Sequence, residues 1–360
     1  MAGDTTLTVI SARPTVQISG LDMPALTQNI VRMRMREAAG GLSSLELVLS
    51  DVISVPDGGA VFGGTTRSPT VLGAPIKVFT GDTQSPREIF DGMITAVETE
   101  VGPTTSPLFT VLAEDRLFQA RKTRKTRSFT KVSPADLVNK IATELSLTPQ
   151  VRDGLDAPAG DWTQMNESDL AFLRRVLERF DADIQAVDDK LQAGPNARDP
   201  RTKVTLTLGQ NLLRARITAD LADQAAEVRV ASFDPATGKP VTATASDGQL
   251  GPGSGKNGAA VLRDKFSPWR EHAGHLGPMT STEADKVARA LYGRRARRFV
   301  RIDGAAQGDG NIRVGTHATI AGVNPLFANI YVLTEITHRF DLDTGYLTEF
   351  LGECACMGGS

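Results

Sequence analysis

The sequence has little of what many binding and catalytic proteins require. Of its 360 residues only two are cysteine and four are histidine, and aromatic residues make up 5%. Two cysteines exclude a disulfide framework and favour a reduced fold. The scarcity of aromatic side chains argues against a stacking surface for single-stranded nucleic acid.

Long apolar runs and a secretion leader are also missing. No apolar stretch approaches the ~18 residues that a membrane helix needs. The start, Met1-Ala2-Gly3-Asp4, lacks the basic residues and apolar segment of a signal peptide. The formal net charge of −2 requires no anionic partner. We therefore expect no membrane anchor, synthesis in the cytoplasm, and export, if any, only inside a larger particle.

Two pairs of candidate ligands are poorly placed for a metal. His272 and His275 form H-x-x-H, and Cys354 and Cys356 form C-x-C, which is tighter than usual zinc spacing. Four such ligands could hold a tetrahedral zinc. However, we expect the histidines to lie in a solvated loop and the cysteines in a frayed C-terminus. The sequence thus predicts no metal and no cofactor.

A glycine-rich segment resembles a phosphate-binding loop only superficially. Residues 251–257 read Gly-Pro-Gly-Ser-Gly-Lys-Asn. Leu250 stands where the Walker pattern needs glycine, and Asn257 stands where it needs the Ser or Thr that holds magnesium. A flexible loop explains this composition.

Nucleophilic and acid–base catalysis find little support. There is no G-x-S-x-G elbow. The other candidates are histidines in strand patterns, expected to be structural, and carboxylate pairs beside turns, where Asp binds local backbone: His317, His338, Asp181/Asp183 and Asp341/Asp343. We therefore predict no catalytic, cofactor-binding or metal-binding residue, and no enzyme.

Hydrophobic periodicity divides the chain into three parts. Residues 1–115 contain short alternating segments typical of a barrel or sandwich. Among these, 7–10 and 31–36 are expected strands, the latter with Val31, Met33 and Met35 on the buried face and arginines on the other. Residues 55–75, rich in Gly, Pro and Thr, predict a long mobile loop.

The middle part, 116–200, reads as an α+β module. Ser133-Pro134-Ala135-Asp136 is a strong helix start. A second helix at about 168–180, capped by Asn166 or Ser168, has an apolar stripe that includes Leu173 and Leu177, which we expect to be buried.

The last part, 201–360, returns to β structure. A helical insertion is expected near 280–295, where Thr280 to Glu283 forms a capping box. A hairpin is expected at the end, with strands at 330–340 and 346–351. The order suggests two similar β units around an inserted module, without proving a duplication.

Two basic clusters interrupt this pattern. Residues 116–131 and 286–301 each hold seven Lys or Arg and no acidic residue. They could contact nucleic-acid phosphates. The preferred interpretation is a solvated face, or a surface that pairs with the acidic residues of another subunit, because the chain is slightly acidic and lacks a DNA-reading motif. We do not expect nucleic acid as a partner.

Several segments in order resemble the phage late control D family, which is similar to the N-terminal hub part of VgrG spike proteins. The most specific is 164–178, Gln-Met-Asn-Glu-Ser-Asp-Leu-Ala-Phe-Leu-Arg-Arg-Val-Leu-Glu. Residues 113–117, 133–138, 227–235, 282–285 and 312–350 follow in family order, although Ser232 replaces the usual glycine. The resemblance spans about 100–352, and the rest more loosely.

The resemblance implies a fold and a function. The fold would be mainly β with α+β insertions: two tail-tube-like β-barrels, 1–115 and 201–360, around the module at 116–200, forming a trimeric hub. The function would be that of a baseplate hub in a phage tail or injection system, joining the hexameric tail tube to a trimeric spike. Its partners would be two further copies, a separate spike protein, the tube protein and other baseplate proteins within the virion.

Two other functions stay open at this stage. A tail-associated cell-wall hydrolase would clear peptidoglycan, and a DNA-binding protein would act through the basic clusters. The sequence does not distinguish a phage from a domesticated injection system or a secretion apparatus, and it does not name cargo or target cell.

Overall fold

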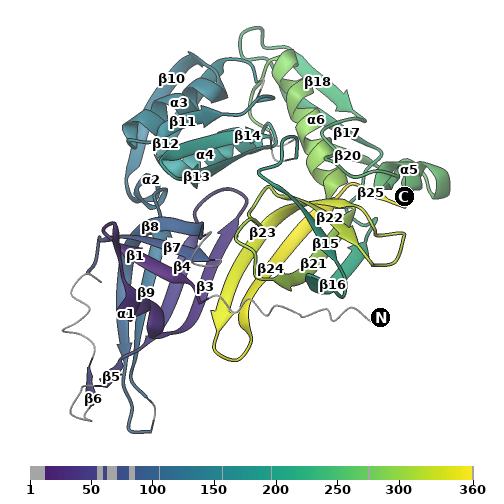
Figure 1. Ribbon diagram of the computed structural model, residues 1–360. Helices are drawn as coiled ribbons and strands as arrows, with labels where there is room; N and C mark the ends of the chain where they lie inside the picture. The colour runs from purple at the N-terminus through teal and green to yellow at the C-terminus, as the bar shows by residue number, and fades with distance from the viewer. Residues whose placement is uncertain are drawn as a thin grey trace.

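A computed structural model describes residues 13–54, 60–62, 71–80, 86–104, 106–155, 157–195, 197–274 and 276–358. The chain is mainly β with α+β insertions, as predicted. Two β units lie side by side, and two α+β parts lie together on the opposite side of the molecule (Figure 1). No helix in the described ranges is long and apolar enough to cross a membrane. The strand expected at 7–10 lies outside these residues.

The first β unit follows the predicted alternation in β3 (Ile30–Ala38). Met33 and Met35 are fully buried, and the arginines between and beside them are exposed. The predicted face is wrong at Val31: the ladder to the next strand shifts register after Ile30, so Ile30 is buried instead. The other elements are β1 (Thr15–Ile18), β2 (Leu21–Asp22), α1 (Pro24–Gln28), β4 (Ser44–Ser50), β5 (Val52–Ser54), β6 (Ala60–Phe62), β7 (Pro75–Thr80), β8 (Arg87–Glu100) and β9 (Leu108–Asp115).

The mobile loop expected at 55–75 lies largely outside the described residues. Within it, residues 60–62 form β6, which pairs with β5. Residues 71–74 lead into β7, and Gly73 has a φ of 83°, a left-handed conformation that favours glycine.

The middle module begins its helices where the sequence predicts. Ser133 and Asp136 form a reciprocal capping box at the start of α3 (Pro134–Glu144). Ser168, not Asn166, caps the second helix, whose Leu173 and Leu177 are buried as expected. The elements are α2 (Phe118–Lys122), β10 (Arg124–Val132), α3, β11 (Thr148–Val151), β12 (Gly160–Ser168), α4 (Asp169–Glu178), β13 (Ala182–Val187) and β14 (Lys190–Pro195).

The last part contains the second β unit and a second α+β insertion. The predicted hairpin is confirmed as β23 and β24, and Thr280 caps the long helix α6. The predicted reciprocal box is wrong in one half, because the Glu283 carboxylate lies 2.7 Å from Arg179 instead. The elements are β15 (Lys203–Thr207), β16 (Leu212–Ala219), β17 (Glu227–Phe233), β18 (Pro240–Ala245), β19 (Lys256–Asn257), α5 (Gly258–Lys265), β20 (Arg270–Ala273), α6 (Ser281–Arg297), β21 (Val300–Gln307), β22 (His317–Ala321), β23 (Ile330–Asp341), β24 (Gly345–Cys354) and β25 (Cys356–Met357).

The two β units share one sheet. Its path runs β16-β21-β24-β23-β3-β4-β9-β8-β7-β1-β2, with β22 and β15 joined to it beside β23. Among the described strands, no ladder closes either unit into a barrel, so the two tail-tube-like β-barrels that the resemblance implies are not confirmed. The physical reason is that β23 is long enough to pair with β22 at its start and with β3 over the rest, which makes the two units continuous.

The two units repeat the same strand order. In the first it is β7-β8-β9-β4-β3, and in the second β22-β23-β24-β21-β16, with every pair antiparallel. The registers match too. The β8·β9 ladder shifts between Ile94 and Ala96, and the β23·β24 ladder shifts between Leu333 and Glu335. One difference is the outer strand: β1 runs antiparallel to β7, whereas β15 runs parallel to β22.

Equivalent backbone and side-chain hydrogen bonds support this repeat. Gly73 N–H donates to Ile94 O at 2.8 Å, and Gly315 N–H donates to Leu333 O at 2.8 Å. Beside these bonds, the Thr95 and Thr334 hydroxyls each donate to a carbonyl of the facing strand at 3.4 Å. The β units are therefore copies of one structural pattern, which includes the bulge in the β8·β9 and β23·β24 ladders.

Candidate functional site: a buried ion cluster at a shared seam

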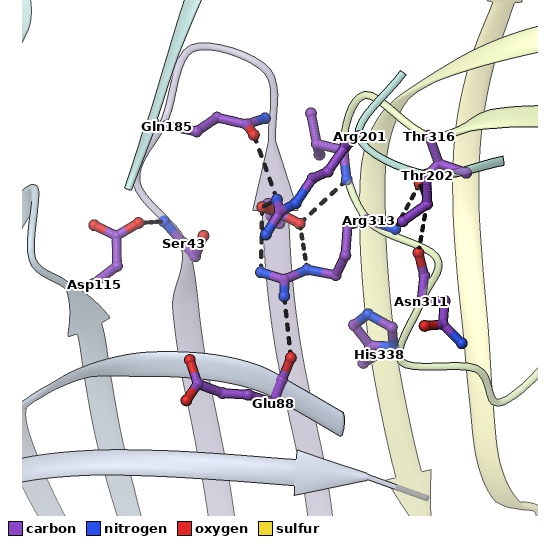
Figure 2. Close-up of polar contacts among 12 residues, drawn as sticks. Ser43, Glu88, Asp115, Gln185, Arg201, Thr202, Asn311, Arg313, Thr316 and His338 are labelled. Carbon is purple, nitrogen blue, oxygen red and sulfur yellow. Dashed lines mark hydrogen bonds and ion pairs between the residues drawn. The ribbon is translucent and has the colours of Figure 1, made fainter. Parts of the chain in front are cut away.

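Glu37, near the end of β3, is a buried carboxylate at the boundary of the two β units. Its residue is 2% exposed. Arg201 donates to its carboxylate at 2.7 Å and Arg313 at 2.8 Å, and the backbone N–H of Val314 adds a bond at 3.2 Å. Figure 2 shows the two guanidinium groups converging from the second β unit and the segment before it, with Gln185 of the middle module beside Arg201.

Glu37 is held as an anion. Burial alone would raise the pKa of its carboxyl, but the charges and hydrogen bonds of Arg313 and Arg201 outweigh this and lower the pKa to about 2. An anion of such low basicity cannot take up a proton near neutral pH. The cluster therefore fits a joint between the units and does not fit a general base.

Two more buried carboxylates fasten the turn that follows β3. Asp115 accepts from the backbone N–H of Ser43 at 2.5 Å, and Asp183 accepts from the N–H of Gly40. Burial raises the pKa of both carboxyls to about 6, although backbone hydrogen bonds oppose the shift. The turn thus links the first unit to the middle module, which contributes Asp183.

His338 lies in β23 below the cluster, as Figure 2 shows. Its Nδ1 is 2.7 Å from the hydroxyl of Tyr346, which also accepts from Thr80 at 3.1 Å. Burial lowers the pKa of His338 to about 3, so the ring is neutral in the folded protein. The predicted structural role of this histidine agrees with these contacts.

The space beside the cluster is small. A cavity of about 100 Å³ is lined by Glu88, Asp115, Arg201 and Arg313 among other residues. Small-molecule sites usually enclose ~300–1,000 Å³ and are mostly apolar. The geometry therefore offers no room for a drug-sized substrate at the charged groups.

The seam between the units runs along β3 and β23 on the solvent side of the cluster. Residues Arg32–Ala38 pair with Glu335–Asp341 in antiparallel register. On the exposed face Arg36 donates twice to Glu335, at 2.8 and 2.9 Å. Arg36 and Glu37 thus stabilise the same seam from the two faces of the sheet. Arg36 does so on the exposed face and Glu37 on the buried face.

This chain can be compared with known proteins by sequence and by fold. The sequence matches the family described as Alg8 N-terminal domain over residues 12–341. The chain belongs to the Alg8 N-terminal domain family. No curated protein matches it.

Solved structures share the fold of this Alg8 N-terminal domain chain at low identity. The 43 kDa tail protein of prophage MuSo2 from Shewanella oneidensis is 11% identical with a TM-score of 0.68, covering 95% of this chain and 98% of its own. A tail protein from Neisseria meningitidis is 12% identical with a TM-score of 0.67, covering 95% and 96%. The Escherichia coli c3393 protein, described as a type VI secretion component similar to the T4 tail proteins gp27 and gp5, is 13% identical with a TM-score of 0.58, covering 94% and 76%. This chain therefore shares its fold with phage tail proteins and with a component of a type VI secretion system.

The candidate metal ligands behave differently from the prediction. Cys354 and Cys356 do not lie in a frayed end: they are buried in β24 and β25, where the core packs around them. His272 is in β20 rather than a loop, and His275 lies outside the described residues. Within the described part of this Alg8 N-terminal domain chain, no group of three or more potential ligands gathers.

The glycine-rich segment is ordered by packing rather than left as a flexible loop. Gly253 lies so close to Cys354 that a Cβ at this position would clash with the sulfur. Asn257 ends the segment by capping α5 through the N–H of Ala260 at 2.8 Å. The predicted absence of a Walker loop stays a prediction, since its basis is sequence.

The aspartates that the sequence places in pairs have different structural partners. Asp181 is buried and forms a two-bond ion pair with Arg297 of α6, at 2.5 and 2.7 Å. Asp183 accepts a hydrogen bond from the Gly40 N–H in the turn that follows β3. Asp341 accepts backbone and side-chain bonds from Thr344 in the β23–β24 turn, the local role predicted for it.

Both basic clusters are largely neutralised within the chain. In the first, Arg127 and Lys125 contact Asp169 and Glu144. In the second, the ion pairs are Arg289–Asp247, Arg294–Glu178, Arg295–Glu271, Arg297–Asp181, Arg298–Glu353 and Arg301–Asp223. These arginines join the two α+β parts and the second β unit, so intramolecular pairing accounts for much of the clustering.

Sequence reasoning missed Glu37, Arg201 and Arg313. One signal was available for the first: Glu37 continues the Met33, Met35 phase and so stands on the buried face of its strand. A carboxylate in that phase predicts a buried partner. The arginines lie 164 and 276 residues away in sequence, and no local pattern marks them.

Proposed function

We propose that this chain is the structural hub of a phage tail or phage-like injection system, joining a hexameric tail tube to a trimeric spike. It would act as a homotrimer with a separate spike protein, the tube protein and other baseplate proteins as partners. It would work as a scaffold and would become part of the assembled particle.

One observation carries the proposal: a single chain contains two β units with the same strand order and with a bulge at the equivalent place in the β8·β9 and β23·β24 ladders. A sixfold tube and a threefold spike need an adaptor with both symmetries. Three chains with two equivalent units each supply six units in a ring, while the chain itself repeats three times. The likeness to tail proteins supports the same interpretation.

The three-part division, 1–115, 116–200 and 201–360, belongs to this proposal. The buried ion cluster supports it, because Glu37, Gln185 and Arg313 come from the three parts and fix them to one another. A rigid joint suits a scaffold whose two units must hold equivalent positions in a ring.

Co-expression with the cognate spike protein tests the proposal. Native mass spectrometry of the purified complex should give three copies of this chain bound to one spike trimer. The isolated chain is allowed to be monomeric, because a hub trimer can depend on the spike. A strict 1:1 heterodimer, or no complex at all, would overturn the hub assignment.

A further inference from the structure

The seam inside the chain provides a template for a contact between chains. The first half of β23 pairs with β22, and its second half, Glu335–Asp341, pairs with β3. In the repeat, β8 is equivalent to β23 and β16 is equivalent to β3. The β23·β3 seam would therefore have a counterpart, in which β8 pairs with β16 of another copy of the chain.

The equivalence of β3 and β16 is detailed. The ladder of β3 to β4 shifts register after Ile30, and that of β16 to β21 shifts after Leu212. The exposed Arg32 lies 3.1 Å from Glu46, and its counterpart Arg214 lies 2.9 Å from Asp303. The two strands thus match in register, in bulge and in their surface ion pair.

The two counterparts are unpaired where the seam would form. Residues 87–93 of β8 pair with β7, but from Thr95 to Glu100 the only described neighbour is β9. In the same way, β16 has a ladder to β21 alone among the described strands, and ends the path of the sheet. Among the described residues, each is an open edge with backbone groups available for pairing.

We propose that β16 of one chain pairs antiparallel with residues 96–102 of a second copy of this chain. The seam gives the register: Ile336↔Glu37 becomes Val97↔Ala219, Thr337↔Arg36 becomes Glu98↔Thr218, and Arg339↔Arg34 becomes Glu100↔Arg216. This interaction rests on the proposed homotrimer and names the surface that makes it. Repeated three times, the head-to-tail contact closes a ring and makes the sheet continuous.

The side chains at this register are complementary. On one face Glu100 stands opposite Arg216, and both are exposed. Opposite charges directly across an antiparallel pair are stabilising. In the seam the same positions hold two arginines, Arg339 and Arg34, so this charge pair is specific to the contact between chains.

The other face has apolar side chains without cover. Ile336 is fully buried within the seam, whereas its counterpart Val97 is 39% exposed, and Val101 beyond it is 62% exposed. On β16 the facing positions are Ala215, Ile217 and Ala219, which are only partly buried. Pairing the two strands would bring these apolar faces together, as it does for Ile336 and its neighbours.

Disulfide trapping tests the register. The variant Glu98→Cys/Thr218→Cys, co-expressed with the spike protein and oxidised, should run as covalent dimers and trimers on a non-reducing gel. Glu98→Cys/Ile217→Cys is the matched control, because residue 217 points to the opposite face of β16. The native Cys354 and Cys356 are buried and should not cross-link. Equal cross-linking of both variants, or none with the first, would overturn the proposed register.

Charge reversal tests the same contact without cysteines. Glu100→Arg alone and Arg216→Glu alone should each weaken the spike-bound trimer about tenfold or more, measured by dilution in mass photometry. The double variant should restore it. Lys239→Glu, in an exposed turn between β17 and β18, should leave the trimer unchanged, and far-UV circular dichroism verifies that each variant is folded.

The outcomes separate this inference from the proposed function. If the wild-type complex holds three chains but neither test gives the expected result, the hub proposal stands and the β16–β8 contact is wrong. If the wild-type chain forms no threefold complex, both are wrong.

Discussion

The two β units of this chain are built alike but finished differently at their edges. In the first unit, β3 is covered by β23, and its inward phase ends in the buried Glu37. In the second, β16 has no described cover, and the position equivalent to Glu37 is Ala219, half-buried. The comparison shows that the edge strand β3 is covered within the chain by β23 and is held there by the buried ion cluster of Glu37. The other edge strand, β16, is suited to a contact that forms during assembly.

The largest effect should come from breaking the covered edge. Replacing Glu37→Gln leaves Arg201 and Arg313 buried without a counter-charge, which should reduce the free energy of unfolding by ~3–5 kcal/mol. Urea denaturation of the purified chain measures this. Glu335→Gln is the matched control on the exposed face of the same seam, and its loss should be at most ~1 kcal/mol, because solvent screens the pair with Arg36.

The effect of Glu37 should also depend on pH. A Glu in the unfolded chain has a pKa of about 4.3, above the value of about 2 in the folded protein. The stability from the carboxylate is therefore complete above about pH 4.3 and is lost as pH falls toward 2. The gap between wild type and Glu37→Gln should narrow over that window, and a gap that widens there would contradict the assigned ion cluster.

The next largest difference in the free energy of unfolding should appear between equivalent positions of β23 and β8. Ile336→Ala removes a fully buried side chain from the covered seam and should reduce stability by ~2–5 kcal/mol. Val97→Ala, at the equivalent position of β8, should change the isolated chain by no more than ~0.5 kcal/mol, because Val97 is exposed. Equal losses in both variants would mean that the edge of β8 is already covered in the single chain.

These contrasts also indicate what the sequence could and could not predict. The alternation around Met33 and Met35 predicts the strand and its buried face, because a period of two is a local property. The shift to Ile30 was not predictable, since a bulge depends on the facing strand. The helix start at Ser133 was predictable because capping is local, whereas the sequence left the cap of the second helix open between Asn166 and Ser168.

The ion cluster and the shared sheet were beyond local reasoning. Arg201 and Arg313 meet Glu37 only after two β units and the middle module have packed together. In the same way, the resemblance implied two tail-tube-like barrels, whereas β23 pairs across the boundary with β3. The resemblance to tail hubs predicted the fold, but the seam depends on long-range register.

A smaller effect, on the pH dependence of stability, should distinguish the end of β9 from the end of the equivalent strand β24. Asp115 ends β9 with a carboxyl whose pKa is raised to about 6, so its stabilising, protonated form is present below about pH 3.9 and is lost as pH rises through 6. Asp115→Asn should therefore flatten the stability profile between pH 4 and 7, by on the order of 2 kcal/mol. Cys354, at the equivalent position of β24, has a thiol pKa raised by burial to about 11 and should contribute nothing in that range. A steeper profile in Asp115→Asn would contradict the burial of this carboxyl.

The smallest effect should come from the surface ion pairs that both units repeat. Arg32–Glu46 and Arg214–Asp303 are equivalent, and all four side chains are well exposed. Glu46→Gln and Asp303→Asn should each change the free energy of unfolding by at most ~1 kcal/mol, and by less in high salt, because water and ions screen such pairs. The two pairs differ in their surroundings: Arg32 already lies opposite Asp341 of β23 within the chain, whereas Arg214 would lie opposite residue 102 of the next chain only in the assembled state. Asp303→Asn should therefore alter the salt dependence of trimer formation while Glu46→Gln, inside the covered unit, should not. Similar salt dependence in both variants would argue that β16 stays at a free edge after assembly, and that this ion pair is repeated only because the two units share a strand pattern.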